Sequence, residues 1–85
     1  MRKLDEIRAD FDRTDGEICR LLERRMELSR EIAETKRVEG IDVVQEDRRR
    51  KVMERWVENC PSYSRESVER IYGIIHKESV KQQEI

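Results

Sequence analysis

Residues 4–36 read LDEIRADFDRTDGEICRLLERRMELSREIAETK, and this stretch decides the fold. Its apolar side chains recur in steps of three, four or seven residues, which is the spacing of one face of an α-helix. They are Leu4, Ile7, Phe11, Ile18, Leu21, Leu28 and Ile32. The spacing predicts one very long helix over about residues 4–37.

Two shorter helices are predicted after it, because residues that break helices are few. Gly40 and Pro61 interrupt the pattern, so helices are expected at about 45–59 and 64–84. The third helix has its own apolar stripe at Val68, Ile71, Ile74 and Ile75. No segment has the alternation of a β-strand, and the expected fold class is therefore all-α with three helices.

Residues typical of helix starts precede both shorter helices. Asp42 followed by Gln45 resembles a capping pair for the second helix, and Ser64 is expected to cap the third. Such side chains bind the backbone N–H groups that a helix start leaves unpaired.

The composition bounds the class of protein. The 85 residues fit a single domain, 1–85, of which 46% are charged and 35% hydrophobic. Lysine and arginine total 19 against 20 acidic residues, which argues against nucleic acid or an anionic membrane as partner. No stretch is long and apolar enough to span a bilayer, and the first residues do not resemble a signal peptide.

The cysteines and the histidine predict no metal site. Cys19 and Cys60 are isolated from each other, and His76 is the only histidine, so zinc ligands at the usual spacing are lacking. Two reduced thiols fit a cytoplasmic protein.

The length of the first helix predicts a dimer. A helix over residues 4–37 would be about 50 Å long, whereas a compact chain of this size is only about 25–30 Å across. One chain cannot surround such a rod with a core. The expected solution is an intertwined homodimer, in which two long helices pack on each other and on the shorter helices.

A cation interrupts the apolar stripe of the first helix. The position between Leu21 and Leu28 that belongs to the stripe is Arg25, and a buried guanidinium needs an anion beside it. Lys36 lies about three turns further on and returns to nearly the same face, with Ile32 between them. These residues predict one wall of an anion pocket. The alternative is that both cations reach solvent at the edge of the bundle.

Arg8 lies outside that pocket within its own chain. It precedes Arg25 by seventeen residues, which is about 25 Å along a helix. In an antiparallel dimer, Arg8 could reach the pocket of the partner.

The third helix changes in the same way from apolar to polar. Ile71 and Ile75 continue at four-residue steps to Ser79 and Gln83, which could hydrogen-bond a ligand held by the cations or form a solvated helix end. His76 is expected at the edge of the bundle rather than as a base. Residues 45–50, QEDRRR, fit either a solvated helix start with local ion pairs or part of the pocket.

The sequence resembles a known family over nearly its whole length. The run at residues 4–36, EDRRRKVMERW at 46–56 and IIHKESVKQQ at 74–83 are similar to the three helices of the all-helical, AroQ-type chorismate mutases. The resemblance implies an intertwined dimer with two active sites that converts chorismate into prephenate, with no cofactor or metal.

The resemblance also implies a role for each pocket residue. Arg25 and Arg48 are expected to hold the carboxylates of the substrate, with Arg8 supplied by the partner chain. Lys36 and Gln83 are expected to flank the ether oxygen as catalytic residues. Ser79 is expected beside a carboxylate or at the rim of the pocket. Ile32 and Val80 are expected to form apolar wall, and Arg50 is expected to face solvent.

Two positions depart from the family pattern, which places acidic residues where this chain has Gln45 and Arg49. The acid at the second position accepts a hydrogen bond from the ring hydroxyl in that family. Either Gln45 or Glu46 could accept it here. The departures leave two alternatives open, namely an isochorismate-pyruvate lyase of the same fold and a non-catalytic helical dimer or regulatory module.

Overall fold

The computed structural model describes residues 1–40 and 45–83 of the chain. In this part the chain is all-helical, without strands, and its three helices are α1 (Leu4–Glu39), α2 (Glu46–Asn59) and α3 (Arg65–Gln83). The expected all-α, three-helix class is confirmed, and the helix ends agree with the sequence prediction to within two residues. Asp42, the predicted cap, and position 84, the predicted end of the third helix, lie outside the described residues.

The helix ends follow from single residues. α1 ends at Gly40, whose φ of 71° lies in the left-handed region that glycine adopts without steric cost, and its N–H binds the Lys36 carbonyl. Ser64 caps α3 as predicted, because its Oγ accepts the N–H of Ser67 at 3.1 Å. Gln45 is the N-cap of α2 but makes no capping hydrogen bond through its side chain.

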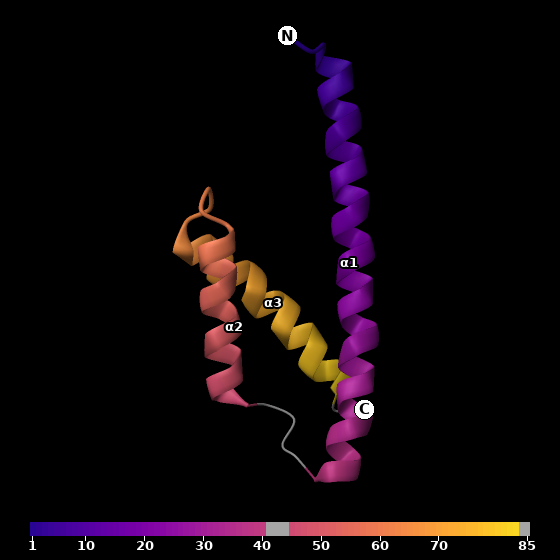
Figure 1. Cartoon of the computed structure of the whole chain (residues 1–85), viewed down its shortest axis with the longest axis vertical. Helices are drawn as coiled ribbons and strands as arrows, with labels where there is room; N and C mark the ends of the chain where they lie inside the picture. The colour runs from indigo at the N-terminus through magenta and orange to yellow at the C-terminus, as the bar shows by residue number, and fades with distance from the viewer. Residues whose placement is uncertain (41–44, 84–85) are drawn as a thin grey trace.

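The three helices form an elongated molecule of 56 × 24 × 14 Å. In Figure 1, α2 and α3 form a hairpin, and α3 runs diagonally from α2 to the C-terminal half of α1. α3 packs against both other helices. The N-terminal part of α1 projects beyond the hairpin, and α3 meets the C-terminal half of α1 (Figure 1).

The core of the single chain is very small. Among the described residues, Val68 and Tyr72 of α3 are the buried apolar side chains. The apolar stripe on the N-terminal half of α1 is uncovered, since Leu4 remains 59% exposed and Phe11 65% exposed. Burial of apolar area is the main favourable term in folding. In a single chain, the apolar stripe of α1 therefore contributes little to the stability of the fold.

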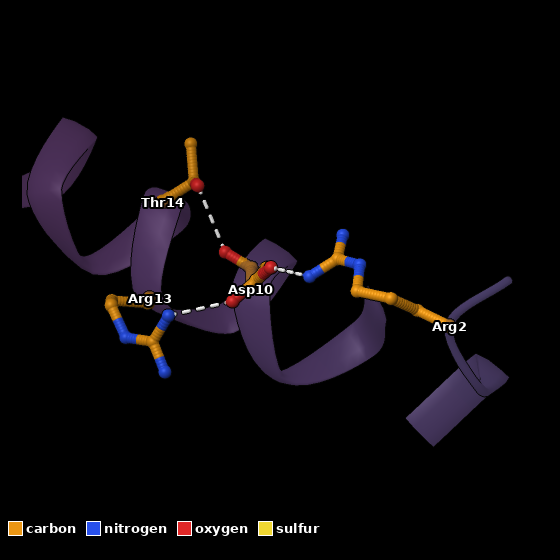
Figure 2. Close-up of polar contacts among 4 residues, drawn as sticks. All are labelled: Arg2, Asp10, Arg13 and Thr14. Atoms are coloured by element: carbon orange, nitrogen blue, oxygen red, sulfur yellow. Dashed lines mark hydrogen bonds and ion pairs between the residues drawn. The ribbon is translucent and has the colours of Figure 1, made fainter. Parts of the chain in front are cut away.

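A polar cluster occupies the start of α1. The Asp10 carboxylate binds the guanidinium groups of Arg2 and Arg13, and Thr14 donates its hydroxyl to the Asp10 carbonyl at 2.8 Å (Figure 2). Arg2 and then Arg13 lower the pKa of Asp10 below its usual range. Arg8 lies on the same stretch of helix, but within residues 1–40 and 45–83 it makes no ion pair or hydrogen bond.

Candidate active site

A cavity of about 740 Å³ opens between the three helices, a volume suited to a small organic ligand. Most residues that the sequence predicted for the pocket line this one cavity. They are Arg25, Ile32 and Lys36 from α1, Gln45, Arg48 and Arg49 from the start of α2, and Ser79 and Gln83 from α3.

The structure does not bring Arg8 or Val80 to the cavity. Arg8 lies exposed on the projecting half of α1. On α3 the lining residues follow one another in steps of three or four, from Tyr72 to Gln83, and Val80 is turned about 100° away from Ser79. The apolar wall consists of other residues than Val80, namely Leu28, Ile32, Val52 and Tyr72.

Arg25 is held at the cavity by an aromatic ring. Its guanidinium carbon lies 5.7 Å from the centre of the Trp56 ring, within the range of a cation–π contact. Trp56 in turn packs on Tyr72 with ring centres 5.3 Å apart. Arg25 is half-buried and does not simply extend into solvent, which was the alternative expectation.

Two buried hydroxyls join α1 to α3 at the cavity wall. Ser29 Oγ lies 2.8 Å from Ser79 Oγ and 2.9 Å from the Arg25 carbonyl, and the two serines are only 5% and 7% exposed. A hydroxyl has one proton, so Ser29 can donate to only one of these acceptors at a time. Ser29 was not predicted as a site residue, although it lies one turn after Arg25 on the same face of the helix and could have been found from that spacing.

The two residues expected at the ether oxygen are already paired. Lys36 Nζ donates to Gln83 Oε1 at 3.2 Å. Because the amide oxygen of Gln83 accepts this bond, its NH₂ group stays a donor. The contact brings two hydrogen-bond donors from different helices to the same part of the cavity.

The QEDRRR segment at residues 45–50 is both a solvated helix start and part of the cavity wall. Arg50 is exposed and pairs with Asp47 at 3.2 Å, whereas Arg48 and Arg49 line the cavity. Arg49 also contacts Glu46, at 3.5 Å. The segment is therefore a helix start with local ion pairs that also contributes two cations to the site.

His76 lies in the cavity wall rather than at the outer edge of the bundle. Its imidazole stacks on the Tyr72 ring with a centre-to-centre distance of 5.7 Å and an angle of 27° between the planes. Burial lowers the pKa of His76, and the charge of Arg49 lowers it further.

The lining has an excess of positive charge. It contains Arg25, Lys36, Arg48 and Arg49 against the carboxylates of Glu31 and Glu39. Within the described ranges, no group of three or more His, Cys, Asp or Glu side chains is arranged to hold a metal ion. None of the described helices is both long and apolar enough to cross a membrane.

Fold and site together define an all-helical protein with a cavity whose lining is mainly cationic. The chain belongs to the chorismate mutase type II family, whose model matches residues 7–84. No curated protein and no solved structure matches the chain in the corresponding searches.

Proposed function

We propose that this chain catalyses the rearrangement of chorismate to prephenate. The observation that carries the proposal is the placement of Arg25, Arg48 and the Lys36–Gln83 pair around one cavity of suitable size. Membership of the chorismate mutase type II family supports the same activity.

The chemistry of this reaction fits the residue types in the cavity. One C–O bond breaks while one C–C bond forms within a single molecule, so no nucleophile or general base is required. The reaction needs the enolpyruvyl arm held over the ring, which arginines achieve by fixing the two carboxylates. Arg25, which contacts the Trp56 ring, and Arg48 both line the cavity, and this supports the role.

Lys36 and Gln83 are the catalytic residues of the proposal. Negative charge develops on the ether oxygen as the C–O bond breaks, and donors aimed at that oxygen stabilise the transition state more than the substrate. Lys36 Nζ lies 3.2 Å from Gln83 Oε1, so the two side chains are already held together. The donors therefore need little rearrangement when the substrate binds.

The proposed active form is an intertwined homodimer. The exposed apolar stripe of α1 includes Leu4, Phe11, Ile18 and Leu21, and a second copy of the same helix offers a matching face. An antiparallel arrangement of the two rods carries Arg8 of each chain to the cavity of the partner. Arg8 would then join Arg25 and Arg48 as a third arginine for the carboxylates and complete the site.

Replacement of Lys36 tests the proposal. We expect purified protein to consume chorismate, and Lys36→Ala to lower kcat by about 10²–10³-fold, as the loss of an oxyanion-type donor does in other enzymes. Loss of chorismate absorbance measures the rate, and circular dichroism checks that helical content is retained.

Lys81→Ala is the matched control, because Lys81 lies on α3, pairs with Glu78 at 3.2 Å and does not line the cavity. It should keep wild-type activity. Absence of turnover by the wild-type protein at micromolar concentration contradicts the proposed function.

A further inference from the structure

His76 lines the cavity, and the proposed function assigns no role to it. Its ring lines the cavity, yet within the described part of the chain no side chain or backbone group forms a hydrogen bond with its nitrogens. Tyr72, Ser79 and Gln83 share the same face of α3. The imidazole is therefore part of the cavity wall formed by α3, and its nitrogens are available to hydrogen-bond a ligand.

The orientation of this imidazole is fixed by aromatic packing. It stacks on Tyr72, which is only 3% exposed and packs against Trp56. Trp56, whose ring is tilted by 58° against Tyr72, also contacts the guanidinium of Arg25. The ring of His76 thus belongs to the same aromatic cluster that contacts Arg25, the residue proposed to bind a substrate carboxylate.

The surroundings favour the neutral imidazole. Burial is the main factor that lowers the pKa of His76, and Arg49 from α2 with Arg25 and Lys36 from α1 act in the same direction. Glu46 from α2 opposes them with a weaker effect than Arg49. A neutral imidazole has one N–H donor and one nitrogen lone pair that accepts a hydrogen bond.

The proposed substrate needs such an acceptor. Chorismate has a ring hydroxyl besides its two carboxylates, and the hydroxyl proton must be accepted when the molecule is enclosed. Arginine and lysine side chains cannot accept it. The Gln83 oxygen already accepts from Lys36, and Ser79 is hydrogen-bonded to Ser29. The other acceptors in the lining are more exposed than His76, and they are Glu31, Thr35, Glu39 and Gln45. The half-buried His76 ring lines the cavity, and among residues 1–40 and 45–83 it has no hydrogen-bond partner.

We propose that His76 is a specificity-determining residue whose imidazole accepts a hydrogen bond from the ring hydroxyl of the substrate. The inference rests on the proposed mutase function and assigns one further contact in the same cavity. It gives the site a means to distinguish a hydroxylated ring from one that lacks the hydroxyl.

Paired substrates test this contact. His76→Leu removes the acceptor and retains an apolar side chain, and His76→Gln restores an acceptor. We expect His76→Leu to lower kcat/KM for chorismate roughly ten-fold, the size of one neutral hydrogen bond, and to leave kcat/KM for the analogue without the ring hydroxyl unchanged. His76→Gln should recover most of the chorismate activity. If His76→Leu lowers kcat/KM equally for both substrates, or for neither, the inference is overturned. The proposed function still stands in that case, provided that the wild-type protein turns over chorismate.

Nuclear magnetic resonance gives a readout that does not depend on variants. His76 is the only histidine in the chain, so its imidazole ¹⁵N signals are unambiguous. Prephenate also has a ring hydroxyl, and at pH 7.5 its binding should shift the signal of the unprotonated nitrogen while the ring stays neutral. A ring that becomes protonated in the prephenate complex, or a nitrogen signal that does not move, overturns the inference. A wild-type protein that neither turns over chorismate nor binds prephenate overturns both proposals.

Discussion

At the scale of single residues, Arg25 shows how a contact with an aromatic ring holds a cation on an apolar helix face. Its guanidinium rests on the Trp56 ring, which recovers part of the interaction lost on leaving water. The position of Arg25 was predictable from the spacing of α1. The role of Trp56 was not, because these residues lie on separate helices and nothing local in the sequence specifies that they meet.

Ser29 provides a test at the same scale. Ser29→Ala removes the partner of the Ser79 hydroxyl and should destabilise the protein by about 1 kcal/mol, the usual value of one hydrogen bond. Because Ser79 would contact the substrate in both ground and transition states, KM should rise several-fold with little change in kcat. Steady-state kinetics and urea unfolding measure the two effects.

The exposed Ser62→Ala is the control for this serine and should alter neither quantity. A fall in kcat at constant KM in Ser29→Ala would contradict the positioning role and assign the serine pair to the transition state instead.

At the scale of elements, α3 organises the site. It packs on both other helices and brings Tyr72, His76, Ser79 and Gln83 to one cavity wall. Its junction with α2 includes a bidentate ion pair, in which the Arg65 guanidinium binds both Glu54 oxygens at 2.8 and 2.9 Å. The position of α2, and with it Arg48, depends on this hairpin.

The ion pair makes a pH-dependent prediction. Arg65 lowers the pKa of Glu54 below its ordinary value of 4.5, so the pair stabilises the hairpin above that pH and loses its effect as pH falls through the lowered pKa. Arg65→Ala should therefore speed amide hydrogen exchange in α2 at pH 7, but not at a pH where Glu54 is protonated. Both groups are solvent-exposed, so the effect should be small and weaken with salt.

Arg70→Ala is the matched control for the hairpin. Arg70 pairs only with Glu66 of the same helix among the described residues, so its loss should not change exchange in α2. Equal effects of the two substitutions would show that the α2–α3 contact does not depend on the ion pair.

Sequence periodicity predicted the positions of the three helices well, but it predicted only part of the side-chain contacts between them. Helix ends depend on local residues such as Gly40 and Ser64, and the spacing on α1 placed Arg25 and Lys36 on one face. The partners of these side chains depend on how α3 crosses α1. This explains why Ser29 and the stacking of His76 on Tyr72 were not foreseen.

At the scale of the whole molecule, the chain is too extended to be a self-sufficient globule. Its radius of gyration is 16.2 Å, against ~12 Å for a compact chain of this length. The excess comes from the half of α1 that projects beyond the hairpin (Figure 1). The uncovered stripe on that half and the unpaired state of Arg8 within the described residues both favour the proposed dimer.

Mixing two inactive variants tests the shared site. Arg8→Ala and Lys36→Ala should each be nearly inactive alone, but one cavity of their heterodimer combines intact Arg8 from one chain with intact Lys36 from the other. After co-refolding of equal amounts, about a quarter of wild-type activity should return, since half the dimers are mixed and one of their two sites is intact. Chorismate turnover measures the recovery.

Arg13→Ala replaces Arg8→Ala in the control, because Arg13 is already engaged by Asp10 (Figure 2). This variant should be active by itself. No gain in activity after co-refolding of Arg8→Ala with Lys36→Ala would place Arg8 outside the partner's site.

The aromatic layer beneath the cavity has a practical consequence. Trp56 is the only tryptophan of the chain, and it lies between the Tyr72 ring and the Arg25 guanidinium. Any carboxylate that binds Arg25 alters the electric field at the indole. The protein therefore contains a built-in fluorophore beside its binding site, and occupation of that site can be followed by emission in the unmodified molecule.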